Sequence, residues 1–233
     1  MSAIKLYELA GADPERRFSP FVWRIRMALR HKGLAFEGVA WRFTEKDVLE
    51  ELGAAGRVPV IVDNGKTVHD SFAIAEYLED TYPDRPSLFG GEIGRATTRF
   101  FNSWADVGVL GQLFPMLVHD IWQQLGPEDQ AYFRESREQR LGKTLEQTVA
   151  DRETRLPGLR QFLTPVRLTL AKHPFLSGAK PAYADYILFG NFMWARNVSP
   201  FKLLAEDDPI HAWRERMLDL YDGEGRKAKG YPV

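Results

Sequence analysis

Residues 56–71 read GRVPVIVDNGKTVHDS, and the architecture of the chain can be worked out from them. Proline has no N–H to give to a sheet ladder, so Pro59 is expected at the first residue or the edge of a strand. A cis bond before Pro59 would leave the backbone N–H and C=O of Val58 free to pair with an extended ligand. Asn64-Gly65 predicts a tight hairpin, which brings Asp70-Ser71 beside that ligand. The stretch therefore predicts a socket for a small peptide.

The segments before and after this stretch predict the element order β-α-β-α-β-β-α. Ser19 is a favoured N-cap and Pro20 a favoured first helical residue, so a helix is expected to begin there and to close at Gly33. Apolar runs and periodicity place the other elements. Strands are expected at 4–9 and 36–41, and further helices at 44–52 and 71–82.

From residue 83 onward the pattern is helical only. The run Pro83-Asp84-Arg85-Pro86 ends the preceding helix, so we expect a first domain over 1–84, a linker over 85–94 and a helical domain over 95–233. Pro115 should bend the first long helix, because a proline inside a helix loses a hydrogen bond. Helices are expected at 95–125, 128–153, 156–172 and 182–197, with a last one from Asp208-Pro209.

Composition removes several classes of function. The formal net charge is −1, which gives no electrostatic basis for binding nucleic acid. No apolar run approaches the roughly 20 residues that span a bilayer, so no membrane partner is expected. The chain has no cysteine, which removes disulfides, thiolate zinc sites and a cysteine nucleophile, and fits a cytoplasmic location. The five histidines show no metal-ligand spacing, so no metal is expected.

Over essentially its whole length the chain resembles the glutathione S-transferase superfamily. The matching pieces are Ser19-Pro20, Val58-Pro59, Asp70-Ser71, Ile74–Leu78 and Ala184-Asp185. The resemblance implies a thioredoxin-like first domain, an all-helical second domain and a homodimer. The family's helix-capping segment usually starts with serine or threonine, but here that position is Ala182, which removes a cap worth about 1 kcal/mol.

Two further stretches narrow the resemblance. The segments Ser19–Arg24 and Tyr221–Arg226 are similar to those of bacterial β-etherases of lignin breakdown and of related fungal serine-type transferases. The narrower resemblance implies detoxification or the breakdown of aromatic compounds.

The resemblance implies that Ser19 is the catalytic residue. A neutral glutathione thiol, with a pKa near 8.5, is a poor nucleophile. Ser19 would donate a hydrogen bond to the thiolate, and the helix N-terminus, with Arg24 and Arg26, would add positive field. Two alternatives remain: Ser19 is only an N-cap, or Tyr7 in the first strand activates the thiol.

The other implied site residues hold glutathione, the co-substrate. Val58 would bond its cysteinyl backbone, with Pro59 setting the turn, and Asp70-Ser71 would hold the γ-glutamyl end. Arg57 is either a glutathione contact or a solvated surface arginine, and Lys46 is a weaker candidate for the glycine carboxylate.

The second substrate implied by the resemblance is a small hydrophobic electrophile bound between the domains. Its attack by the thiolate would displace a leaving group, and aryl ether cleavage is one candidate reaction. The alternative is a non-catalytic member of the family that binds glutathione or aromatic ligands. The expected aromatic wall draws on Phe21, Trp23, Phe101 and Trp104, with Phe114 and Trp122 as further candidates, although a stripe at helical spacing is more often core.

Overall fold

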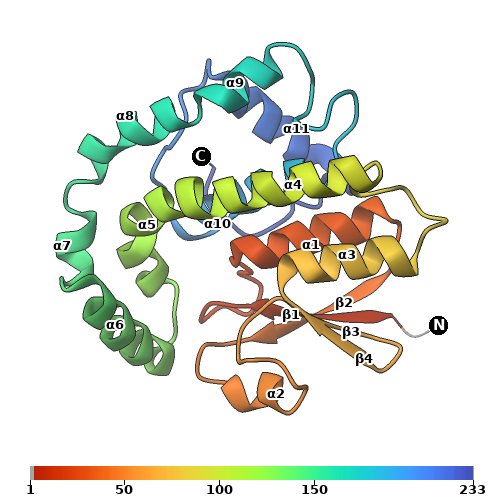
Figure 1. Ribbon diagram of the computed structural model, residues 1–233. Coiled ribbons are helices and arrows are strands. Elements are labelled where there is room, and N and C mark those ends of the chain that lie inside the picture. Colours follow the sequence, from red (N-terminus) through yellow and green to blue (C-terminus); the bar gives the residue numbers. More distant parts are fainter. Residues whose placement is uncertain (1–2, 233) are drawn as a thin grey trace.

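A mixed β-sheet forms the base of the first half of the molecule (Figure 1). The computed structural model describes residues 3–232, so residues 1, 2 and 233 of the expected domains lie outside it. The strand order is β2-β1-β3-β4, with β1 parallel to β2 and antiparallel to β3. The strands are β1 (Ile4–Leu9), β2 (Phe36–Trp41), β3 (Val60–Asp63) and β4 (Lys66–His69). The predicted strands are thereby confirmed.

The β3–β4 hairpin follows from its two central residues. Asn64 and Gly65 have φ angles of 48° and 83°, the left-handed pair that a tight hairpin requires. The register pairs Asp63 with Lys66 and continues to Val60 opposite His69. The first residue of β3 and the last residue of β4 therefore lie at the same end of the hairpin. The chain enters the next helix from that end.

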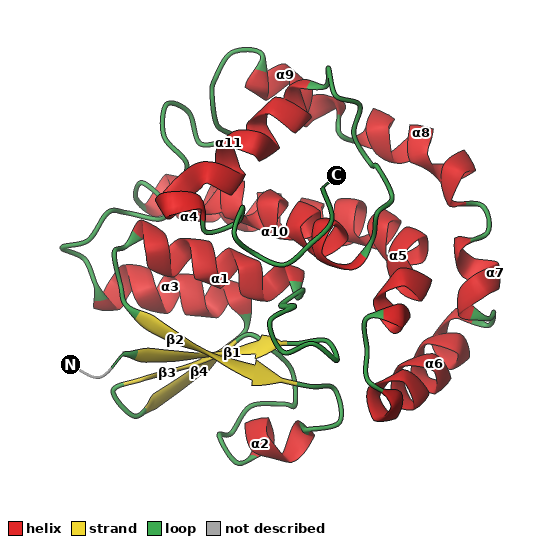
Figure 2. Cartoon of the chain, turned by 180° about the vertical axis from the view of Figure 1, so that it is seen from behind, coloured by secondary structure: helices red, strands yellow, loops and turns green. Residues whose placement is uncertain are grey.

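Three helices accompany the sheet. In both views α1 (Pro20–His31) and α3 (Ser71–Thr81) cover one face, and α2 (Lys46–Glu50) lies on the other side (Figure 2). The helix α1 begins where the Ser19-Pro20 pair predicts, with Ser19 as its N-cap. The order β-α-β-α-β-β-α is confirmed, and the fold is thioredoxin-like in this half.

The second half is helical. Its elements are α4 (Glu92–Trp104), the π-helix η1 (Ala105–Leu110), α5 (Gly111–Gln123), α6 (Pro127–Leu141), α7 (Leu145–Val149), α8 (Arg152–Phe162), α9 (Thr164–Leu170), α10 (Tyr183–Val198) and α11 (Pro209–Gly223). Almost every residue of α10 is buried, which makes it the centre of this half. A Cβ on Gly190 of α10 would lie only 2.3 Å from the carbonyl oxygen of Pro20, so this glycine permits the close approach of α1.

Some predicted helix boundaries are wrong. The predicted helix 128–153 is interrupted at Gly142, whose φ of 65° ends α6, and Thr144 then starts α7 with a capping box to Gln147. The predicted helix 156–172 is divided between α8 and α9, and Thr164-Pro165 opens the second piece. The first long helix starts at Glu92, inside the expected linker.

The irregularity in the first long helix lies before its proline. The π-helix η1 (Ala105–Leu110) comes just upstream of Pro115, which lies inside α5. Because Pro115 has no N–H to give to the preceding turn, a widened turn at this point accommodates the missing bond.

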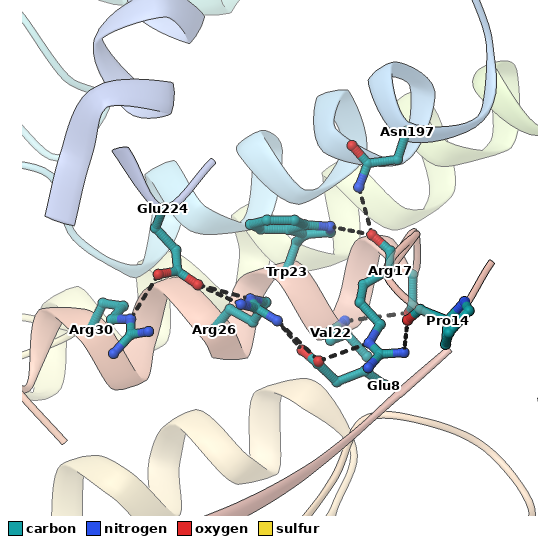
Figure 3. A network of polar contacts seen from close by, with 10 residues as sticks. Glu8, Pro14, Arg17, Val22, Trp23, Arg26, Arg30, Asn197 and Glu224 are labelled. Carbon is teal, nitrogen blue, oxygen red and sulfur yellow. Dashed lines mark hydrogen bonds and ion pairs between the residues drawn. The ribbon is translucent and has the colours of Figure 1, made fainter. Parts of the chain in front are cut away.

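The C-terminal segment is fastened to the first half by ion pairs (Figure 3). Tyr221, Asp222 and Gly223 all have positive φ angles, which turn the chain sharply near the end of α11. Glu224 then accepts hydrogen bonds from Arg26 at 2.6 Å and from Arg30 on α1 at 2.9 Å. The stretch Tyr221–Arg226, singled out by sequence, thus joins the two halves.

Candidate functional site

A cavity of about 760 Å³ separates the first half of the molecule from α5, α6 and α10. Its floor comes from the N-terminus of α1, the α2 region and the loop before β3. Its opposite wall comes from the helical half. The lining residues that matter here are Ser19, Phe21, Lys46, Glu50, Arg57 and Val58 on one side, and Phe114, Tyr132, Arg137, Arg140 and Trp194 on the other.

Ser19 is held at the bottom of this cavity by its place in the chain. It has an extended backbone and caps α1, its Oγ accepting a hydrogen bond from the N–H of Val22 at 3.3 Å. Ser19 is only 3% exposed. Because Oγ is the acceptor in the bond with Val22, the hydroxyl proton stays available for a ligand. The alternative residue Tyr7 pairs with Val60 within the sheet and does not line the cavity.

The loop before β3 presents backbone groups to the same cavity. The peptide bond between Val58 and Pro59 is cis, which is the condition named above for a free Val58 backbone. Within residues 3–232 the backbone N–H and C=O of Val58 form no hydrogen bond. An extended ligand could therefore pair with this backbone as an additional strand would.

Asp70 and Ser71 lie at the end of the hairpin nearest to this loop, since the register brings Val60 opposite His69. Asp70 caps α3, its Oδ1 accepting from the N–H of Phe72 at 2.9 Å and of Ala73 at 3.0 Å. Its residue is exposed and has a φ of 71°. The expected helix cap is therefore present, and one carboxylate oxygen of Asp70 is left over for a ligand.

Four cationic side chains line the cavity, against one carboxylate, Glu50. Lys46 lies 4.4 Å from the centre of the Tyr132 ring, and its ammonium lowers the pKa of that phenol. Arg57 is exposed and lies at the cavity edge. Sequence reasoning did not find Arg137 and Arg140 as site residues. The available signal was their position on α6, where Phe133, Arg137 and Arg140 share one helical face.

Two other arginines expected to act on Ser19 are neutralised elsewhere. Arg24 is completely buried and binds Asp106 at 2.6 Å. Arg26 pairs with Glu8 at 2.8 Å and with Glu224 at 2.6 Å. The positive field at Ser19 therefore comes from the N-terminus of α1 and not from these side chains.

The aromatic candidates separate into two groups. Phe21 lines the cavity. Trp23 is 1% exposed, and its Nε1 donates to the carbonyl of Arg17 at 2.9 Å. Phe101 and Trp104 stack with a centroid distance of 5.3 Å. These three residues do not line the cavity. Trp23 packs on Phe189 of α10, and Trp104 stacks on Phe162 of α8.

Among the aromatic residues that line the cavity beside Phe21 are Phe114, a further candidate from the sequence, and Trp194. Phe114 of α5 stacks on Trp194 of α10, with centroids 6.3 Å apart and planes 17° apart. Trp194 lies in a helix that reads as core, so its sequence pattern gave no sign of a binding role. Trp122, another candidate, stacks on His119 and does not line the cavity.

The described part of the chain contains no group of three or more His, Asp or Glu side chains placed to hold a metal ion. Among residues 3–232, no helix is both long and apolar enough to cross a bilayer.

Comparison with known proteins gives consistent matches. Residues 14–86 match the family model for the glutathione S-transferase N-terminal domain, and residues 96–218 match that for the C-terminal domain. Glutathione S-transferase U22 of Arabidopsis thaliana is 25% identical over 92% of both chains. Glutathione S-transferase U19 of the same plant is 26% identical and aligns over 86% of this chain and 81% of its own length, whereas four other curated relatives align over less than half of theirs.

Two solved fungal structures are similar along nearly the whole chain. A glutathione transferase of Phanerochaete chrysosporium has 30% identity and a TM-score of 0.77, covering 96% of this chain and 93% of its own. A glutathione S-transferase of Ceriporiopsis subvermispora, solved in complex with glutathione, has 27% identity and a TM-score of 0.81. The match covers 95% of this chain and 97% of that one.

Proposed function

The chain belongs to the glutathione S-transferase family, and we propose that its cavity activates glutathione at Ser19 for attack on a hydrophobic electrophile. One observation carries the proposal: the helix-capping hydroxyl of Ser19 and the unpaired backbone of Val58 line the same cavity. The similar structure with bound glutathione supports glutathione as the co-substrate.

Ser19 acts by stabilising charge. The Ser19 hydroxyl donates to the glutathione sulfur and so favours the thiolate over the thiol, because a hydrogen bond to a charged group contributes about 1.5–3 kcal/mol. The N-terminus of α1 adds a favourable dipole. Ser19 does not remove a proton; it lowers the pKa of the bound thiol so that more thiolate is present at neutral pH.

The rest of glutathione lies along the exposed edge of the sheet. Val58 pairs with the cysteinyl backbone, and Pro59 fixes that turn. The Asp70 carboxylate faces the γ-glutamyl ammonium, and Ser71 with its amide binds the γ-glutamyl carboxylate at the N-terminus of α3. Lys46 and Arg57 bind the glycyl carboxylate.

The reaction is nucleophilic substitution at an electrophilic carbon. The thiolate forms a C–S bond, and the leaving group departs with the electron pair of the broken bond. A finer proposal is cleavage of a β-aryl ether, in which the leaving group is a phenolate. The sequence similarity of Tyr221–Arg226 to etherase-type relatives supports it, although in this chain Glu224 of that stretch binds Arg26 and Arg30. Phe21, Phe114 and Trp194 supply the apolar wall for the electrophile.

Homodimer formation is a further part of the proposal. Ile93, Phe100 and Val107 are spaced by seven residues along α4 and η1, and each is more than 70% exposed. An exposed apolar stripe of this kind is typical of an interface. We propose that a second copy of the chain covers it.

A panel of electrophiles tests the proposed function. The protein and glutathione are incubated with a β-aryl ether model compound, a chlorinated dinitrobenzene and an organic peroxide, and substrate loss is followed. Consumption of the ether with release of a phenol supports the etherase reaction, and consumption of the aryl chloride alone supports a transferase of broad range. Glutathione binding without consumption of any probe would contradict catalysis and favour a binding protein.

A further inference from the structure

Arg137 and Arg140 are cationic residues of the cavity that the proposed glutathione contacts do not use. Both lie on α6, at i and i+3, and both line the cavity. In the proposed binding mode the γ-glutamyl end is held at Asp70-Ser71 and the glycyl carboxylate at Lys46 and Arg57. The charges on α6 are therefore in excess of what glutathione needs.

Arg137 lacks a counter-charge. Its Nη1 donates to the Ser136 hydroxyl at 2.8 Å, while its buried Nε has no partner. Burial lowers the pKa of Arg137, and contact with the Tyr132 phenol offsets this in part, but no carboxylate within the described residues pairs with it. Its guanidinium also packs on the Phe133 ring, 4.5 Å from the ring centre. A buried or half-buried cation is normally paired, so an unpaired one in a ligand cavity indicates an anionic group on the ligand.

Arg140 places a second positive charge next to the aromatic residues Phe114 and Trp194. Its guanidinium lies 4.6 Å from the centre of the Phe114 ring, and Phe114 stacks on Trp194. Within residues 3–232 Arg140 forms no ion pair. An aromatic ring packed on this wall would thus have a guanidinium at its edge.

Resting on the proposed function, we infer that the second substrate is an aromatic electrophile carrying a carboxylate, which Arg137 and Arg140 bind. The carboxylate orients the ring so that its electrophilic carbon faces the sulfur at Ser19. Arginine suits this task because its planar donors match the two carboxylate oxygens. The neutral aromatic analogue would lack this anchor.

The test uses a charged and a neutral probe with the same reacting carbon and leaving group: 4-chloro-3,5-dinitrobenzoate and its methyl ester. In both, the thiolate forms a C–S bond and chloride leaves with its electron pair. The measured quantity is kcat/KM for the carboxylate divided by kcat/KM for the ester. We expect this ratio to fall about tenfold in Arg137→Gln and about threefold in Arg140→Gln. The effect is smaller for Arg140 because its side chain is more exposed to solvent.

Lys143→Gln is the matched control, because it removes the same charge just beyond α6 from a residue outside the cavity lining. The ratio should stay unchanged in this variant. An unchanged ratio in both arginine variants would overturn the inference. If Arg137→Gln does not fold, the Arg140→Gln result decides alone.

Glutathione affinity separates the remaining explanations. If the dissociation constant of glutathione rises while the ratio stays unchanged, the arginines bind glutathione and the inference is wrong. If the wild type turns over neither probe but consumes the β-aryl ether of the panel above, the proposed function stands; if it consumes no electrophile of that panel, the proposed function fails. In both cases the S-aryl glutathione conjugates of the two probes are then used in calorimetry. A selective loss of affinity for the carboxylate conjugate in Arg137→Gln would still support the inference, and equal affinities would refute it.

Discussion

At the scale of single residues, the site depends on groups that the fold leaves without partners. Ser19 uses its oxygen to cap α1 and keeps its proton, and the backbone of Val58 is unpaired beside it. The same holds for Arg57, an exposed residue that lines the cavity and forms no ion pair with any residue from 3 to 232. These groups differ from ordinary helix caps and surface charges because each keeps a donor, an acceptor or a charge free for a ligand in the cavity.

Arg57→Ala tests the proposed contact with the glycyl carboxylate. The change should raise the dissociation constant of glutathione about three- to tenfold, because one charge-assisted contact is lost at a partly solvated position. The melting temperature should stay the same, since Arg57 has no partner to lose. Calorimetric titration with glutathione checks the first point and a thermal melt the second. Unchanged glutathione affinity would make Arg57 a solvated surface residue.

Sequence reasoning succeeded at this scale where the signal was local. The cap at Ser19, the cis bond at Pro59 and the cap at Asp70 each follow from a few adjacent residues. It failed for Trp23, which lies in the core, and it missed Arg137 on α6. Whether an aromatic or charged residue faces a cavity depends on packing between distant helices, which spacing along the chain does not specify.

At the scale of elements, one buried carboxylate organises the start of α10. Asp185 is fully buried and accepts from the N–H of Leu176 at 2.8 Å, of Ser177 at 3.1 Å and of Ala182 at 3.2 Å. It also accepts from Nε1 of Trp213 at 3.0 Å. The bond to the N–H of Ala182 is thus one of four that Asp185 accepts.

Asp185→Ala should lower the free energy of unfolding by about 3 kcal/mol, because it leaves buried donors without an acceptor. Chemical denaturation measures the difference. The control Asp207→Ala changes an exposed carboxylate and should stay within about 0.5 kcal/mol of the wild type. A loss below 1 kcal/mol in Asp185→Ala would show that water replaces its bonds.

The stability that the Glu224 ion pairs give to the C-terminal segment depends on pH. Burial alone would raise its pKa, but hydrogen bonds and charge from Arg26 and Arg30 hold the pKa of Glu224 below its usual value. The carboxylate is therefore less protonated in the folded chain than in the unfolded one. Its stabilisation is present above the unfolded pKa of about 4.5 and is lost as the pH falls through the folded value.

Glu224→Gln should lower the free energy of unfolding by about 1–2 kcal/mol at pH 7. The difference from the wild type should shrink below about pH 4.5, because the wild-type carboxyl is then becoming neutral too. Denaturation at several pH values measures it, with the exposed Glu153→Gln as control. A difference that stays constant with pH would contradict the ionic role of Glu224.

Sequence periodicity identified most elements but not their interruptions. The strands and α1 begin where short signals predict them, whereas the helical half contains breaks at Gly142 and Thr164 that the predicted helices ran through. Pro165, next to Thr164, was a local signal for the second break. Gly142 lies in a charged run and is compatible with an unbroken helix, so only its packing partners decide whether that helix continues.

At the scale of the whole molecule, the two halves form one cavity and are joined by polar contacts far apart in sequence. Glu8 on β1, Arg26 on α1 and Glu224 after α11 form a continuous network (Figure 3). On the outer surface, Ile93, Phe100 and Val107 remain exposed along α4 and η1. The polar network joins the two halves of the molecule that line the cavity. The exposed apolar stripe is the proposed contact with a second copy of the chain.

Phe100→Glu tests the dimer. A charge in the middle of the exposed stripe should convert the dimer into a monomer, because it would be buried without a partner. Sedimentation velocity measures the change, and Leu168→Glu on α9 is the control, since Leu168 is also exposed, at 66%, but lies off the stripe. A monomeric wild type, or equal dissociation in the control, would contradict this interface.

The most direct test of the central claim is a pH titration of glutathione bound to the protein, followed by the absorbance of its thiolate. The account predicts that the bound thiol titrates at least one pH unit below free glutathione, whose thiol pKa is about 8.5. In Ser19→Ala the midpoint should move back up by about one unit while glutathione still binds. A bound thiol that titrates like free glutathione, or a midpoint unaffected by Ser19→Ala, would contradict the account.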